Sequence, residues 1–200
     1  MRIRTLALIS GALLTMAVLA GCTQTTYDMG GMPGMDHGSG MMGGTQPTTA
    51  SNAADQMFVQ MMIPHHQQAI EMADLLLGKS GIDPRVTDLA KQIKAAQGPE
   101  IDTMNGWLRA WGIATSTKGM DMGGGMMSDA DMTALRSANG TDAARLFLQQ
   151  MTTHHQGAID MAKTEVATGT DPAAIALAKA IIDGQTAEIA TMQTLLGSLR

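Results

Sequence analysis

The feature that most constrains the fold of this chain is an internal repeat. Residues 58–73 (FVQMMIPHHQQAIEMA) return 89 positions later as residues 147–162 (FLQQMTTHHQGAIDMA). Each copy is followed by a second matching segment, 83–108 and 171–196, at an offset of 88. Self-similarity at a fixed spacing is typical of folds built from copies of one unit. We therefore expect two copies of a two-element unit, with one residue gained or lost in a connecting loop.

Both elements of the unit have the signals of α-helices. Asp83-Pro84 and Asp171-Pro172 each predict a helix start, with the aspartate as N-cap and the proline as first helical residue. No segment alternates as a half-buried strand does. Four amphipathic helices joined by short loops predict an all-α, ferritin-like four-helix bundle built from two repeated helical hairpins. We expect the bundle at 53–200, with repeat one at 53–111, a crossover at 112–140 and repeat two at 141–200.

Two details qualify this pattern. Ser128, with Asp131 three residues on, predicts the start of a short helix over 128–137 within the crossover. Pro64 lies directly before the first His-His pair and removes one intrahelical hydrogen bond. We expect the helix to kink there or to begin anew. The second copy has Thr153 at the same place, so the chemistry of the pair does not need a proline.

The N-terminus has the layout of a secretory signal. Arg2 and Arg4 stand at the start of an apolar run that ends in Leu19-Ala20-Gly21-Cys22, which resembles the bacterial lipobox. Cys22 is the only cysteine of the chain, so it cannot form an internal disulfide. We expect 1–21 to be a lipoprotein signal peptide and Cys22 to be lipidated, which anchors the protein at the periplasmic or extracellular face of a membrane. Residues 22–52 are then a flexible Met/Gly-rich tether.

Methionine is unusually abundant, with 20 residues in 200. Many of these residues stand in Gly-rich segments that cannot build a packed core, so packing does not explain them. We expect them to act as auxiliary metal ligands, together with one histidine of the tail: Met29, Met32, Met35, His37, Met120, Met122, Met126 and Met127. The net charge is −5, no Lys/Arg block exists and aromatic content is 2%, which excludes nucleic acid as a partner.

Helical spacing places the paired histidines beside methionines. Met62 stands three residues before His65 and four before His66, and both spacings bring side chains together on a helix. With about 100° per residue, His65 points inward and His66 lies at the rim. The second copy has Met151, His154 and His155 in the same places. Further inward positions hold the remaining candidate ligands, Met72, Met161, Met104 and Met192, and two carboxylates, Glu100 and Glu188, which could ligate metal or accept a hydrogen bond from a histidine.

The donor types decide which metal we expect. Thioethers favour Cu(I), while imidazole accepts copper in either oxidation state. We therefore predict Cu(I) as the preferred ion, Cu(II) as an alternative and silver as a mimic. A ferritin-like metal oxidase, with di-iron or copper, is a second hypothesis, which Glu71, Glu100, Asp160 and Glu188 keep open. Against iron, methionine stands three residues before His65 and before His154, where a di-iron motif has glutamate. A metal-free structural bundle is the third hypothesis. No hydrolase signature, phosphate loop or nucleotide fingerprint is present, and we assign no enzymatic role.

The motif His-His-x-x-Ala-Ile-x-Met-Ala, at 65–73 and 154–162, resembles the domain-of-unknown-function 305 (DUF305) family. The segment Met126-Met127-Ser128-Asp129-Ala130-Asp131-Met132-Thr133-Ala134-Leu135 resembles it too, and the similarity extends over about 53–200. The resemblance implies a secreted, ferritin-like helical bundle that binds copper through Met and His. The implied ligands are Met62, His65, His66, Met72, Met151, His154, His155 and Met161. Leu146 and Gln150 replace Met57 and Met61 of the first copy. We expect a copper-binding lipoprotein that sequesters Cu(I) or exchanges it with donor or acceptor proteins in copper homeostasis or resistance.

Overall fold

The computed structural model describes residues 51–114 and 124–199, and within them every regular element is an α-helix. The helices are α1 (Ala53–Leu77), α2 (Pro84–Trp111), α3 (Asp129–Ser137), α4 (Gly140–Thr168) and α5 (Pro172–Ser198). The predicted all-α class is thus confirmed. No helix among these residues is long and apolar enough to cross a membrane.

Local side-chain chemistry fixes where α2, α3 and α5 begin. Asp83 and Asp171 cap the N-termini of α2 and α5 with a proline in the first turn, as predicted. Ser128 and Asp131 form a capping box at the start of α3, also as predicted. Pro64 does not restart the helix, because α1 runs through it without interruption, and α2 likewise runs through Pro99. Of the two expectations for Pro64, a kink or a new helix start, the second was therefore wrong.

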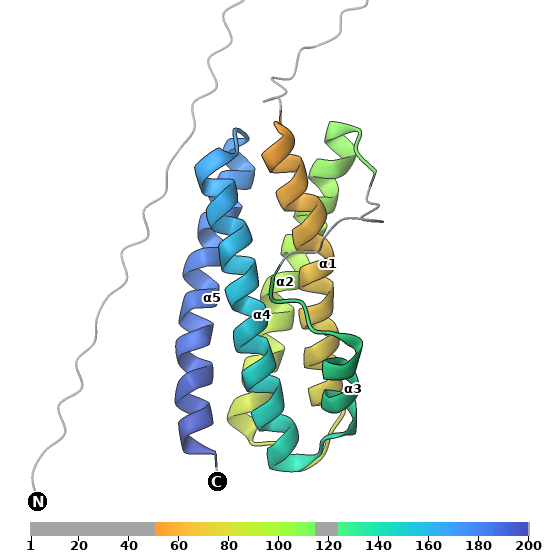
Figure 1. The fold of residues 1–200 in the computed structure, drawn as a ribbon, viewed down its shortest axis with the longest axis vertical. Helices are drawn as coiled ribbons and strands as arrows, with labels where there is room; N and C mark the ends of the chain where they lie inside the picture. Colours follow the sequence, from red (N-terminus) through yellow and green to blue (C-terminus); the bar gives the residue numbers. More distant parts are fainter. Residues whose placement is uncertain (1–50, 115–123, 200) are drawn as a thin grey trace, which may run out of the picture. The chain divides into compact units, whose positions relative to one another are not determined.

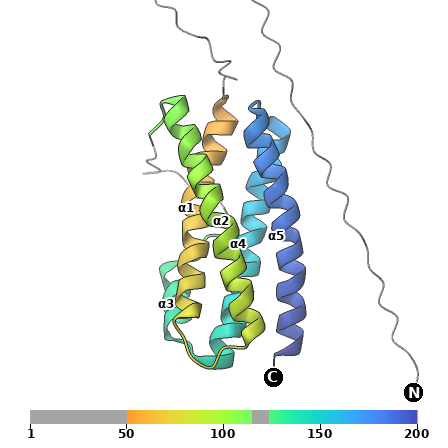
Figure 2. The same cartoon turned by 180° about the vertical axis from the view of Figure 1, so that it is seen from behind.

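The four long helices pack as two hairpins, α1 with α2 and α4 with α5, and the hairpins meet mainly through α1 and α4 (Figure 1). Figure 2 shows α2 and α5 on the opposite side, where they make few contacts with each other. Asn52, the N-cap of α1, donates to the carbonyl of Thr168 at the end of α4 (2.8 Å). The two His-His helices therefore run antiparallel, and the midpoint of α1 faces the midpoint of α4.

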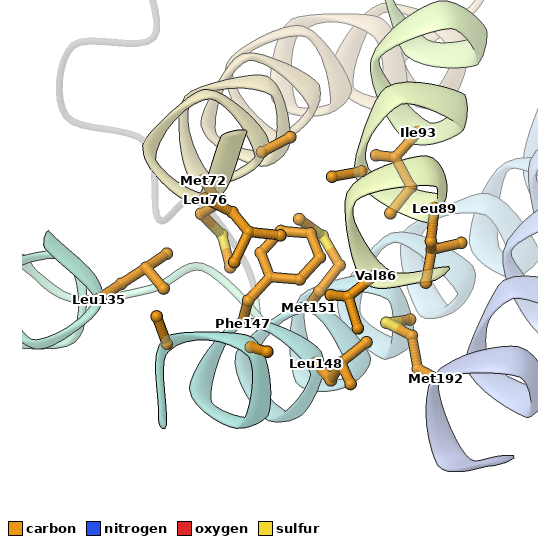
Figure 3. Close-up of a cluster of buried hydrophobic side chains, with 14 of the residues drawn as sticks. Met72, Leu76, Val86, Leu89, Ile93, Leu135, Phe147, Leu148, Met151 and Met192 are labelled. Atoms are coloured by element: carbon orange, nitrogen blue, oxygen red, sulfur yellow. The ribbon is translucent and has the colours of Figure 1, made fainter. Parts of the chain in front are cut away.

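The buried apolar side chains form two clusters. One, at the α3 end, contains Phe147, Met72, Met151 and Met192, and Figure 3 shows these thioethers among aliphatic groups. The other contains Met62 and Met104, with Phe58, Leu108 and Ile181. Neither cluster includes the paired histidines, which stand along α1 and α4 between Met62 and Met72 and between Met151 and Met161. The core thus has a polar layer near its centre.

A buried carboxyl group joins the two hairpins at the other end. Asp55 in the first turn of α1 is fully buried and accepts from the backbone N–H of Thr170 (2.9 Å) and of Asp171 (3.0 Å). Glu165 lies beside it, since a Cβ placed on Gly169 would meet both carboxyl groups. Burial, together with Asp55, raises the pKa of Glu165 from 4.5 to about 8. Glu165 is therefore protonated at pH 7 and able to share its proton with Asp55.

Candidate metal centre

The paired histidines of the two repeats meet at the centre of the bundle. The rings of His65 and His154 lie with centroids 3.8 Å apart and planes inclined by 41°. Both residues are at most 1% exposed, and neither ring nitrogen of either residue has a hydrogen-bond partner. Unpartnered polar atoms in a core are costly, so these two rings call for a physical explanation.

Burial also decides the protonation of these rings. It lowers the pKa of His65 from 6.5 to about 3, with repulsion from His66 and His155 adding to the effect. The backbone of Gly124 acts in the opposite direction, although its geometry falls short of a hydrogen bond. The pKa of His154 is lowered well below its usual range for the same reasons, burial first. Both imidazoles are neutral at pH 7, and a neutral imidazole has the lone pair that a metal ion needs.

The second histidine of each pair is held by a glutamate of its own hairpin. His66 Nε2 lies 2.7 Å from Glu100 Oε2, and His155 Nε2 lies 2.7 Å from Glu188 Oε2. Because a carboxylate only accepts, each Nε2 donates this hydrogen bond. Both Nδ1 atoms are buried without a partner. A carboxylate that orients a histidine in this way is common around metal ligands.

This geometry corrects one prediction from the sequence. His66 and His155 were expected at the rim of the helix face, but both are 0% exposed. The helical angle was not at fault. Glu100 on α2 bonds to His66, and Glu188 on α5 bonds to His155. The side chain at the rim of one helix is therefore buried once the second helix of its hairpin packs against it. Of the two roles considered for the glutamates, the structure shows the hydrogen bond to histidine.

The predicted methionine ligands are not gathered at one point. Met72, Met151 and Met192 lie in the cluster at the α3 end, and Met62 and Met104 lie in the other. Met161 is only partly buried and packs against the second cluster. Within 51–114 and 124–199, no three His, Cys, Asp or Glu side chains are grouped so as to hold a metal ion. A metal site built on the histidines therefore needs thioether sulfur as a further ligand, or rotation of the imidazole rings that brings their nitrogens together.

The auxiliary candidates divide between described and undescribed parts of the chain. Met127 packs against the cluster at the α3 end, and its backbone exchanges two hydrogen bonds with the Gln68 side chain (2.7 and 2.8 Å). Met126 is partly buried beside it. The other candidates, and the cysteine expected to carry lipid, lie outside the described residues: Cys22, Met29, Met32, Met35, His37, Met120 and Met122.

The sequence did not predict that the crossover packs against the paired histidines. A Cβ on Gly157 would stand 1.9 Å from the carbonyl oxygen of Gly124 and 2.8 Å from Cα of Gly125, so the crossover backbone lies directly on α4 beside the histidines. Gly125 has φ +95°, which favours glycine. A signal was present in the repeat, because Gly157 stands where the first copy has Gln68. Both positions contact the crossover, one by leaving space and the other by hydrogen bonds.

A family profile and similar solved structures point to the same protein family. The profile of a family described as "Domain of unknown function (DUF305)" matches residues 55–196. No curated protein matches the chain in sequence. Among solved structures, a DUF305 protein from Streptomyces coelicolor, provisionally described as secreted, is 34% identical with a TM-score of 0.68, over 72% of this chain and 92% of that one. A DUF305 fragment from Deinococcus radiodurans is 31% identical with a TM-score of 0.66, over 74% and 99%.

A third similar structure is that of a protein called CopM in its Cu(I)-bound form. It is 34% identical with a TM-score of 0.60, over 70% of this chain and 94% of that one. The same protein has been solved with Cu(II), with silver and in an apo form. At these identities and coverages, the similarity extends beyond the fold to the sequence of almost the whole relative.

Proposed function

This chain belongs to the DUF305 family, and from that premise we propose that it binds copper outside the cytoplasm, as a lipoprotein that sequesters Cu(I) or delivers it to a partner protein. The observation that carries the proposal is the layer of four buried histidines, each with at least one ring nitrogen that has no partner. The ferritin-like arrangement of the four long helices and the lipid anchor on Cys22 are parts of the same proposal.

The energetics of the histidine layer favour a ligand over a packing role. Leaving a buried polar group without a hydrogen bond costs about 1–3 kcal/mol. His65 and His154 together leave four nitrogens in this condition, between two clusters of apolar side chains. An apolar residue would fill the same space without that cost. The metal-free structural bundle therefore offers no reason for these residues, whereas a bound metal ion satisfies the same nitrogens.

The donor chemistry favours copper and leaves room for both oxidation states. Neutral imidazoles accept Cu(I) and Cu(II), and the thioethers flanking the layer favour Cu(I) and Ag(I). CopM, which is bound to Cu(I), Cu(II) or silver in its structures, supports this choice. We expect His65, His66, His154 and His155 to provide nitrogen and the methionines one helical turn from them, Met62 and Met151, to provide sulfur. Met72, Met104, Met161 and Met192 stay candidates for the same role.

We infer that a metal ion approaches the histidines between α2 and α5. A pocket of about 50 Å³ lies there, and its lining includes Gln97, Gln185, Glu100 and Glu188. The side chains of Glu100 and Glu188 are 24% and 22% exposed, and each is bonded to a fully buried histidine. Their carboxylates would attract a cation at the surface and pass it to His66 or His155, with no large opening of the bundle.

The oxidase hypothesis uses the same two glutamates in another way. A di-iron centre needs carboxylates as ligands, but here each glutamate already binds a histidine, and Met62 and Met151 stand where a Glu-x-x-His motif has its glutamate. Oxygen consumption by the iron-loaded protein above that of free iron would favour this hypothesis. Its absence, with copper bound, supports the copper proposal.

A Cu(I) competition titration against a chromophoric chelator, without oxygen, tests the proposal. We expect the full mature chain to take copper from the chelator. A variant with His65, His66, His154 and His155 all replaced by Leu should lose the tightest binding. The matched control, Gln67→Ala with Gln156→Ala, alters exposed neighbours of the same pairs and should bind as the unaltered protein does. Unchanged copper affinity in the histidine variant, with its helical content retained, would refute the assignment.

A further inference from the structure

A second feature of the structure points to soft metal ions, and it lies apart from the histidines. A pocket of about 220 Å³ opens between the start of α1 and the end of α4. Its lining includes three methionines, Met57 and Met61 from α1 and Met161 from α4. Met57 is 56% exposed, and it is the one exposed large hydrophobic residue in the part of the chain that the structure describes. Thioether sulfur is thus offered to solvent here.

The equivalent positions in the other half of the repeat pack against α3 and form no open surface. The positions equivalent to Met57, Met61 and Met161 in the other half are Leu146, Gln150 and Met72. Leu146 and Met72 are packed with Met132 and Leu135 of α3, and Gln150 donates to the carbonyl of Asp131 (3.0 Å). In Figure 1, α3 lies beside the far end of α1, away from the orange start of that helix. Where α3 covers the surface, two of the three sulfur atoms are replaced, and where the surface is open, all three are present.

The donor set selects the kind of ion. Met57 and Met61 are one helical turn apart, so their side chains lie side by side, and Met161 faces them from the antiparallel helix. Three unbranched side chains can converge on one ion, because each has three rotatable bonds. The harder groups of the lining are engaged elsewhere, since Thr164 donates to the carbonyl of Asp160 (3.1 Å) and Glu165 lies against Asp55. Sulfur alone favours a soft monovalent ion over Cu(II), iron or zinc.

We propose that Met57, Met61 and Met161 form a separate, solvent-accessible site for Cu(I) or Ag(I), which captures the ion by sulfur alone. The proposal rests on the proposed function only in taking copper as the ion that the protein handles. It assigns Met161 to this pocket and leaves the histidine layer to the other ligands. Being open, the site exchanges its ion faster than the buried layer does.

The test uses the full mature chain labelled with ¹³C at the methionine methyl groups and titrated with Ag(I). The substituted chain has Met57→Leu with Met61→Gln, the residues of the second repeat, and neither position belongs to the buried core. The control is Met132→Leu, which removes a thioether of α3 that lies outside the pocket and is not among the candidate metal ligands. We expect the methyl resonances of Met57, Met61 and Met161 to shift together in the unaltered protein. The double variant should bind one Ag(I) fewer, and the control should bind the same number.

The outcomes separate this proposal from the proposed function. If the three methyl resonances stay in place, or if the double variant keeps the full stoichiometry, the pocket is not a site, whatever the histidine variant does. If the double variant loses one ion while the histidine variant loses a different one, both proposals stand. If only the histidine variant loses an ion, the pocket proposal is wrong and the copper function is unaffected.

Discussion

Adjacent histidines of one pair should respond in opposite directions to the same substitution. In the metal-free protein, His65→Leu removes two buried ring nitrogens without partners and replaces them with an apolar group of similar size. His66→Leu instead breaks the bond to Glu100 and leaves a partly buried carboxylate without its donor. The first change should stabilise the fold and the second should destabilise it.

The magnitudes follow from the contacts. Each unsatisfied buried group costs about 1–3 kcal/mol, so removing the two nitrogens of His65 should gain roughly 2 kcal/mol after imperfect packing of leucine. In a protein of this size, about 1 kcal/mol shifts the melting temperature by about 2–4 °C, so a rise of roughly 4–8 °C is expected. Loss of the bond from His66 to Glu100 should lower the free energy of unfolding by about 1–3 kcal/mol.

Thermal and urea unfolding, followed by circular dichroism at pH 7 with a copper chelator present, measures both changes. The same His65→Leu variant should lose most of the thermal stabilisation that copper gives to the unaltered protein, because a ligand stabilises only the state it binds. Equal destabilisation by His65→Leu and His66→Leu would refute the argument, since it would mean that the His65 ring is held by partners as good as Glu100.

Three further comparisons test the contacts of Gly157, Glu188 and Glu165. Gly157→Ala should lower the free energy of unfolding, measured in urea, by roughly 1–3 kcal/mol, because its Cβ would overlap the Gly124 backbone. Gly184→Ala, whose Cβ would have nothing within 4 Å, should raise it by about 0.5–1 kcal/mol. Equal effects of the two substitutions would contradict this. Glu188→Ala should cost about 1–3 kcal/mol, and Glu188→Gln, which keeps a hydrogen bond to His155, clearly less. The pKa of Glu165 is about 8 in the folded protein and about 4.5 in the unfolded chain. Because the folded state keeps a proton that the unfolded state loses, the free energy of unfolding should fall as the pH rises from about 4.5 to about 8, by a few kcal/mol at about 1.4 kcal/mol per pKa unit. Glu165→Gln should abolish this fall. If urea unfolding gives the same change in the free energy of unfolding between pH 5 and pH 9 for the unaltered protein and for Glu165→Gln, this last expectation is wrong.

What the sequence predicted well depends on neighbours along the chain. Asp83, Asp171 and Ser128 cap helices because a short side chain reaches the N–H groups two or three residues ahead, and no tertiary contact is needed for that. The repeat likewise implied that His65 and His154 have equivalent surroundings. These features could be predicted because their causes lie within a few residues or within the repeat itself.

What the sequence left undetermined depends on packing between helices. The angle of His66 on α1 is a property of one helix, but its burial depends on α2, whose glutamate lies against it. The angle of Met161 equals that of Met72 in the repeat, yet α3 packs in the cluster that buries Met72, while Met161 lines an open pocket. A short helix inserted in the crossover thus breaks the equivalence of the two halves, and no periodicity within either copy shows it.

The most direct test of copper binding by the histidine layer is a crystal structure of the copper-loaded protein with anomalous diffraction at the copper edge. We expect an anomalous peak within bonding distance of a ring nitrogen of His65 or His154, with the two rings turned from their metal-free contact. Peaks confined to surface methionines, with the four histidines arranged as in the metal-free fold, would contradict the assignment of the layer as a copper site.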